Sequence, residues 1–227
     1  MIPAYSYKTV CRELTNAFRT RYPGDAAHKV RMVGLVFARP SSPLAAAEII
    51  PNLDYFHHRS GDNIDFFCAG YGGYWEGRSD EFPDQKVVGP GQYTNWLFSA
   101  QRFNSFRSEI ESMSRWRYSG GADLILTDAR YNLDKKESEL DFSTAIVINL
   151  DKAKAEKAIV NVEQFFEDVF RYAETQSGDD PTWGFSDRMG KRVAGSALKS
   201  LVLAILPKSI EEDARKAFHF YVSDINP

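Results

Sequence analysis

The chain of 227 residues has little cysteine and no long apolar run. Its two cysteines, Cys11 and Cys68, lie far apart and form no CxxC pair or other metal-ligand spacing. The longest apolar run, residues 201–206, is too short to cross a bilayer. The first residues lack the basic and apolar regions of a signal peptide. We therefore expect a reduced, cytoplasmic protein that makes no contact with a membrane.

Neither sign of charge predominates, because 28 basic and 31 acidic residues leave a net charge of only −3. Such a balance gives no attraction of the whole molecule to nucleic acid or to an anionic membrane. A nucleotide-binding loop is absent as well: in Gly190–Ser196 the lysine follows the first glycine, not the second. The sequence contains no complete nucleophile triad or metal cluster, so we expect no cofactor and no metal.

The most informative part of the sequence is a predicted βαβ unit. Val30–Ala38 is almost entirely apolar, which is typical of a strand covered on both faces. Ser42 is a suitable N-cap and Pro43 a suitable first residue for the helix that follows. Pro51 should kink this helix and Gly61 should end it. Ile64–Ala69 is then expected to form the second strand.

Further elements are predicted from apolar spacing and from turn residues. The 15 aromatic residues between positions 55 and 118, of 31 in the chain, favour a thick aromatic core. The expected elements are helices over 8–21, 94–113 and 151–175, strands over 123–127 and 144–150 with a charged turn between them, an irregular loop or short hairpin over 70–91, and a helical extension over 184–227 whose last residues favour an edge strand.

These elements predict a single α/β domain over residues 1–227, with its core at about 30–175. We expect a central mixed sheet of four to five strands, with helices on both faces and a C-terminal helical extension. The order βαβ, α, ββ, α resembles the thioredoxin-like fold. The two-cysteine motif of that family would lie near Pro40–Leu44, which here contains no thiol, and no proline directly precedes the strand at Asp123. The resemblance therefore implies a fold and no redox activity.

The turn from Arg39 to Ser42 is the first candidate binding site. It follows the carboxyl end of a central strand, where open α/β sheets usually bind ligands. Arg39, Ser41 and Ser42 would combine a guanidinium, two hydroxyls and a helix N-terminus around a phosphate or carboxylate. The structural alternative is that Ser42 is only a cap and that Arg39 pairs with a nearby acid.

The second candidate group is His57, Arg59 and Asp65. Adjacent histidines at 57 and 58 point about 100° apart on a helix, which does not suit a shared metal ion. These basic groups would instead offset the dipole at the helix C-terminus or bind an anion. Asp65 lies among apolar residues of a predicted strand, so it needs a partner, for which Arg39 or a histidine is expected. Asp65 is also the candidate catalytic base.

Two patterns in the sequence are found in proteins that act on or bind nucleic acid. Asp123 and Asp128 bracket a strand and could hold Mg²⁺, but the acid-x-lysine triplet of nucleases occurs only in the charged turn at 134–136. Arginines and aromatic residues alternate over 102–118, as in single-strand binders, yet Glu109 and Glu111 dilute this patch. We do not expect a nucleic-acid partner.

The sequence thus favours a non-catalytic binding protein that recognises a protein partner or a small anionic ligand. The alternative is a hydrolase, directed at a phosphate ester or at nucleic acid, that uses Asp65 with the Arg39 and Ser42 helix end. The two differ in one geometric requirement. A hydrolase needs Asp65, Arg39 and Ser42 to converge on one open site.

Overall fold

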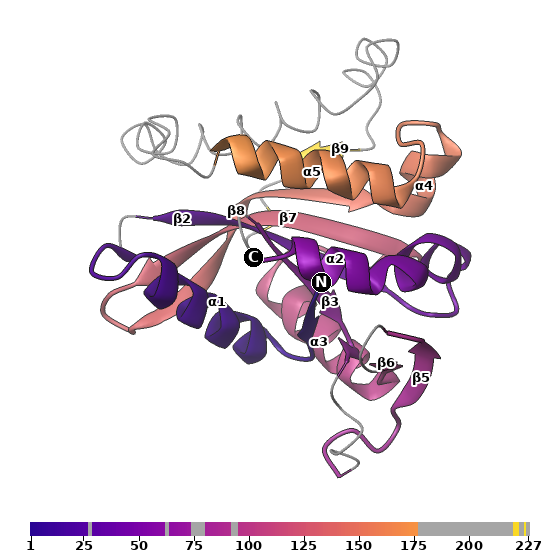
Figure 1. The fold of residues 1–227 in the computed structure, drawn as a ribbon, viewed down its shortest axis with the longest axis horizontal. Coiled ribbons are helices and arrows are strands. Elements are labelled where there is room, and N and C mark those ends of the chain that lie inside the picture. Colours follow the sequence, from indigo (N-terminus) through magenta and orange to yellow (C-terminus); the bar gives the residue numbers. More distant parts are fainter. Residues whose placement is uncertain are drawn as a thin grey trace.

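The computed structural model describes residues 1–26, 29–61, 64–73, 80–91, 95–176, 220–222 and 225. In these ranges the chain folds into a mixed α/β architecture with one large sheet and one small sheet (Figure 1). The strands of the large sheet are, in spatial order, β1 (Ile2–Ala4), β3 (Ile64–Ala69), β2 (Val30–Ala38), β7 (Ala122–Asn132), β8 (Glu137–Asn149) and β9 (Phe220–Val222). The predicted α/β class with a mixed sheet is confirmed, with six strands in place of four to five.

The predicted central strand is correct, since β2 has neighbours on both sides and eight of its nine residues are buried. The strands β1, β3 and β2 are parallel, whereas β7, β8 and β9 each run antiparallel to their preceding neighbour in the sheet. Ala38 at the end of β2 lies opposite Ala122 at the start of β7. This register brings the residues after β2 and those before β7 to the same end of the sheet.

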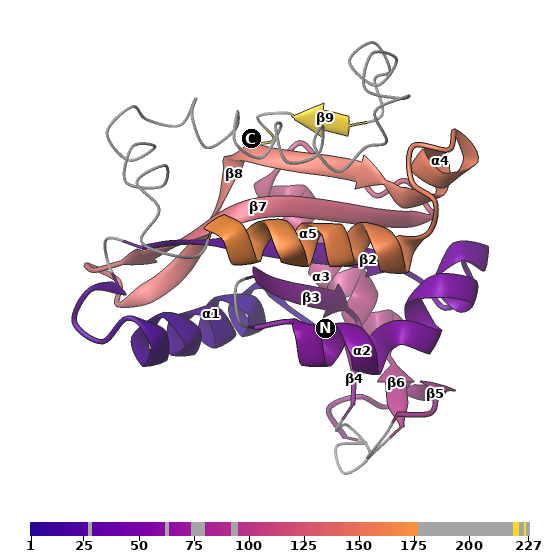
Figure 2. The ribbon, with the colours of Figure 1, turned by 45° about the horizontal axis from the view of Figure 1, so that its top comes forward.

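Helices cover both faces of the sheet, as expected. They are α1 (Tyr7–Arg21), α2 (Leu53–Arg59), α3 (Ala100–Met113), α4 (Leu150–Ala155) and α5 (Val162–Gln176). Phe37 on β2 packs against Phe106 of α3, with ring centroids 5.3 Å apart. Phe66 on β3 packs against Phe166 of α5 at 4.9 Å. Because α5 lies in front of the sheet and α3 behind it, these aromatic contacts fill two separate core layers (Figure 2).

The helix after β2 is irregular, as Pro51 predicts. It begins at Pro43, passes through a π-helical turn, η2 (Ala45–Ile49), and a 3₁₀ turn, η3 (Ile50–Asn52), and becomes regular only in α2. Proline has no backbone N–H to donate, so the pattern of hydrogen bonds along the helix has to change around Pro51. Gly61 follows with φ at 110°, a conformation that favours glycine and ends the helix.

Several predicted boundaries were wrong. The hairpin strands β7 and β8 extend much further than 123–127 and 144–150, so the charged turn is shorter than expected. The helix predicted over 151–175 is split into α4 and α5, and Lys157 between them has a positive φ of 60°. The helix predicted from Thr94 starts at Ala100, where the Ser99 hydroxyl accepts the Arg102 amide, and Thr94 itself lies outside the described residues.

A second, small sheet takes two of its three strands from the predicted irregular loop over 70–91. Its strands are β4 (Tyr71–Gly72), β6 (Trp96–Phe98) and β5 (Lys86–Gly89), paired antiparallel in that order. Its strands β5 and β6 lie near α3 (Figure 1), whereas β4 follows directly after β3 of the main sheet. Phe82 and Leu97 form a small apolar cluster there with Tyr5. Most of the predicted helical extension over 184–227 lies outside the described residues, and within it Phe220–Val222 is the strand β9.

Candidate functional site

A tight turn follows the end of β2 and contains the first predicted site. The Ser42 amide donates a hydrogen bond to the Arg39 carbonyl over 2.9 Å, and the Ser42 carbonyl accepts from the Ala46 amide at 3.0 Å. Ser41 is exposed, whereas Ser42 is only 7% exposed. The structure therefore brings Arg39, Ser41 and Ser42 together at the surface end of a buried strand, as the sequence predicts.

The prediction that the Ser42 side chain caps the helix was wrong. Its hydroxyl oxygen has no hydrogen-bond partner among the described residues, although it is buried. The helix does begin here, since the Ala46 amide donates to the Ser42 carbonyl, but the Ser42 hydroxyl accepts none of the first amides. The hydroxyl is thus not used to stabilise the helix end.

Arg39 is held by α3. Its Nη2 donates to Asn104 Oδ1 over 2.7 Å, and its Cζ lies 5.1 Å from the centroid of the Phe103 ring. Its Nε is buried and has no hydrogen-bond partner in the described part of the chain. An unpaired buried polar group costs about 1–3 kcal/mol, so such groups call for a specific explanation. Arg39 Nε and Ser42 Oγ are two of them within one turn.

The segment before β7 forms the neighbouring wall of this site. Asp123 accepts hydrogen bonds from the Ser119 amide at 2.8 Å and from the Ser119 hydroxyl at 2.5 Å. The Ala122 amide donates to Asp151 Oδ2 at 2.6 Å. Asp151 lies in the first turn of α4, where the helix dipole favours a carboxylate. Two carboxylates therefore lie close to the start of β7.

Tyr118 lies between these charges. Its hydroxyl donates to the Gly121 carbonyl at 2.5 Å, and its ring packs edge-on against Phe103 at 5.4 Å. The pKa of Tyr118 is raised, first by burial and then by the charges of Asp123 and Asp151, while Arg39 opposes the rise. The pKa of Asp123 is raised by burial and by Asp151, against the hydrogen bonds from Ser119.

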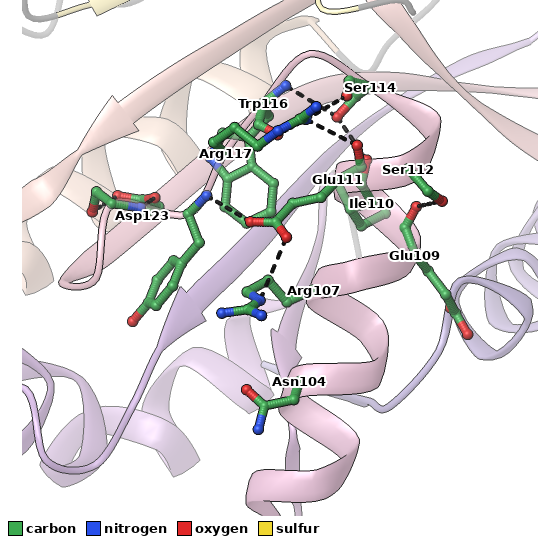
Figure 3. A network of polar contacts seen from close by, with 12 residues as sticks. Asn104, Arg107, Glu109, Ile110, Glu111, Ser112, Ser114, Trp116, Arg117 and Asp123 are labelled. Atoms are coloured by element: carbon green, nitrogen blue, oxygen red, sulfur yellow. Dashed lines mark hydrogen bonds and ion pairs between the residues drawn. The ribbon is translucent and has the colours of Figure 1, made fainter.

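A polar network fixes this wall to the end of α3 (Figure 3). Arg117 Nη1 donates to the carbonyls of Glu111, Ser114 and Trp116 at 2.9, 2.9 and 2.7 Å. The Tyr118 amide donates to Glu111 Oε1 at 3.0 Å. Glu111 lies in the last turn of α3 and Ser114 is its C-cap, so Arg117 acts as a side-chain cap of this helix and is held in place. The arginine and aromatic alternation seen in the sequence is therefore largely structural.

Asp65 lies at a different place from this site. It is near the start of β3 and pairs with Val33, six residues before Arg39, so the parallel strands separate it from Arg39 by about 20 Å. Its partner is Arg31, not Arg39 or a histidine. Arg31 Nε donates to Asp65 Oδ2 over 2.8 Å, and both side chains are almost completely buried. Asp65, Arg39 and Ser42 do not converge.

The other two predicted ligand residues are also engaged elsewhere. His57 Nδ1 lies 2.5 Å from the Met1 carbonyl, and its ring packs edge-on against Trp96. Arg59 binds Glu167 of α5, with Nε 2.9 Å from Oε1, and stacks over Phe170. The five predicted ligand residues therefore do not form one site. Only Arg39, Ser41 and Ser42 lie at the same place.

Sequence reasoning missed Asn104, Tyr118 and Asp151. In the sequence Asn104 falls within a predicted helix and Tyr118 within an aromatic-rich stretch, and only the fold places them near Arg39. The signal for Asp151 was its place in the first turn after a strand. The structure also explains the glycine at position 121, because a Cβ there would collide with the Asp151 carboxylate.

Within the described ranges, no group of three or more histidine, cysteine or acidic side chains is arranged to hold a metal ion. The helices in the same ranges include none that is both long and apolar enough to span a membrane. Comparisons with protein-family models, with curated proteins and with solved structures found no match.

Proposed function

We propose that this chain is a non-catalytic binding protein that recognises an anionic group at the turn from Arg39 to Ser42. One observation carries the proposal. Arg39 Nε and Ser42 Oγ are both buried at this turn and have no hydrogen-bond partner among the described residues. An N–H of a guanidinium and a serine hydroxyl are donors that suit a phosphate or carboxylate oxygen.

The position of the turn supports the proposal. It follows the carboxyl end of β2, and Ser41 and Pro43 on either side of Ser42 are exposed. Arg39 is already ordered by Asn104 and Phe103, so binding would not have to immobilise a flexible side chain. Preorganisation of this kind lowers the entropic cost of binding.

A hydrolase receives no comparable support. Asp65 is buried in an ion pair with Arg31 and is distant from the turn. Asp123 is occupied by the Ser119 amide and hydroxyl. A general base must lie within hydrogen-bonding reach of its substrate, and neither carboxylate has a geometry that favours this role.

We also propose that the resemblance to the thioredoxin-like fold reflects architecture without redox chemistry. The order of the described elements, with a parallel β2–β3 pair and an antiparallel β7–β8 hairpin, supports it. The free thiols Cys11 and Cys68 are buried, in α1 and β3, and not in the turn. Burial raises the pKa of Cys11 to about 11 and that of Cys68 to about 12, which keeps both thiols protonated and unreactive at neutral pH.

The test is calorimetric titration of the full chain with inorganic phosphate. We expect saturable binding in about the millimolar range, which is typical of one guanidinium with few further donors. Arg39→Gln should weaken it about tenfold or more, because a charge-assisted hydrogen bond is lost. Ser42→Ala should weaken it by a smaller factor.

Two matched controls exist in the chain. Arg102 also lies over an aromatic ring, donates to a backbone carbonyl and has a buried unpaired Nε, but it faces the small sheet. Ser138 likewise has a buried unpaired hydroxyl, on β8. Arg102→Gln and Ser138→Ala should leave phosphate binding unchanged. Absence of binding, or equal loss in the test and control variants, would refute the proposed function.

A further inference from the structure

Opposite charges flank the first residue of β7. On one side, Ala122 lies opposite Ala38, the residue before Arg39. On the other side, the Ala122 amide donates to Asp151 Oδ2. The start of β7 therefore lies between the segment that carries Arg39 and the Asp151 carboxylate.

The Asp151 carboxylate has capacity for a further donor. Only its Oδ2 takes part in the hydrogen bonds of the described residues, and its side chain is half-buried. The backbone at Gly121 makes room for it, since any Cβ at that position would collide with Oδ2. An ionised carboxylate can accept several hydrogen bonds, so Oδ1 remains available for an ammonium group.

Tyr118 connects the two charged sides. Its ring and hydroxyl lie between Phe103, which is stacked under Arg39, and the Gly121 carbonyl, next to the Asp151 carboxylate. The same tyrosine interacts electrostatically with Arg39 and with Asp151. The end of β2 and the start of β7 are thus parts of one polar site with a positive and a negative side.

We infer that the anionic group bound by Arg39 and Ser42 belongs to a zwitterionic ligand whose amine is received by Asp151. This inference rests on the proposed function and names its ligand class. A purely anionic ligand that extended toward β7 would meet Asp151 and the buried Asp123, and like charges at short range disfavour binding. An amine at the same place would form a charge-assisted hydrogen bond.

The test compares phosphoethanolamine with ethyl phosphate, which has the same phosphate and chain length but no amine. We expect the full chain to bind phosphoethanolamine about threefold to fivefold more tightly, the range for a partly exposed ion pair. Asp151→Asn keeps an acceptor for the Ala122 amide and removes the charge, so it should abolish this preference. Asp134→Asn, in the exposed turn at the far end of β7, makes the same change of net charge and should retain it.

Equal affinity for the two ligands in the unmodified chain would overturn the inference, as would a preference that persists in Asp151→Asn. The proposed function would survive both results, provided that Arg39→Gln still weakens the binding of ethyl phosphate. If neither ligand binds, the proposed function fails and the inference fails with it.

Discussion

Arg31 and Asp65 form an ion pair inside the main sheet, with the Arg31 guanidinium 2.8 Å from the Asp65 carboxylate and both side chains at most 3% exposed. They belong to adjacent parallel strands and lie on the same face, because Asp65 pairs with Val33, two residues after Arg31. Arg31 Nη2 also donates to the Gly61 carbonyl at 3.2 Å. The pair therefore links the start of β2 to the turn that precedes β3.

Asp65→Asn should destabilise the fold by about 3–5 kcal/mol, because it leaves a buried guanidinium without its counter-charge. Urea unfolding followed by circular dichroism measures this free energy. The double variant Arg31→Met with Asp65→Leu removes both charges and should recover most of the loss. Exposed Asp134→Asn is the control. If Asp65→Asn lowered the free energy of unfolding no more than Asp134→Asn does, Asp65 would not be a buried partner of Arg31.

Gly34→Ala should destabilise the fold by about 1–3 kcal/mol through overpacking. A Cβ at position 34 would lie 2.7 Å from two ring carbons of Phe66, which pairs with Gly34 across the β2–β3 ladder. The Phe66 ring has no room to move away from such a Cβ, since it packs against Phe166 of α5. Thermal unfolding measures the effect, and adding Phe66→Leu should relieve the clash. Full stability of Gly34→Ala alone would show that the ring has room to move.

Stability should fall between pH 7.5 and 5.5, with part of the loss due to His57. Burial lowers the pKa of His57, against the hydrogen bond to the Met1 carbonyl. The unfolded chain therefore binds a proton at about pH 6.5 while the folded chain does not, so stability present above that pH is lost below it. Urea unfolding at the two pH values should show a smaller loss in His57→Gln. His58→Gln, at the exposed neighbouring position, should behave like the unmodified chain.

The apolar pattern was sufficient to predict the βαβ unit, because a continuous, β-branched-rich run such as Val30–Ala38 is typical of a strand covered on both faces. The same pattern could not delimit β7 and β8. Their outer halves carry polar residues such as Arg130 and Glu139, which resemble a loop until the strands pair. Trp96 falls within the predicted helix over 94–113 but lies in β6, because that segment pairs with β5 and with the more distant β4.

The candidate site was predictable only as a turn. A strand, a serine and a proline indicate a helix start after position 41, and this part was correct. Which basic side chain pairs with Asp65, and which side chain orders Arg39, depends on strand register and helix packing. Arg31 is 34 residues from Asp65, Asn104 is 65 residues from Arg39, and Asp151 is 29 residues from Ala122, so no local pattern relates these partners.

The central claim is that Arg39 and Ser42 donate to a bound anion, and the Arg39 Nε–H resonance tests it most directly. In a ¹⁵N-labelled sample titrated with inorganic phosphate, the account predicts a saturable shift of the Arg39 Nε–H signal and no shift of the Arg102 Nε–H signal. The Arg39→Gln and Arg102→Gln variants assign the two signals. An Arg39 signal that stays unchanged, or that moves only in parallel with that of Arg102, would contradict the account.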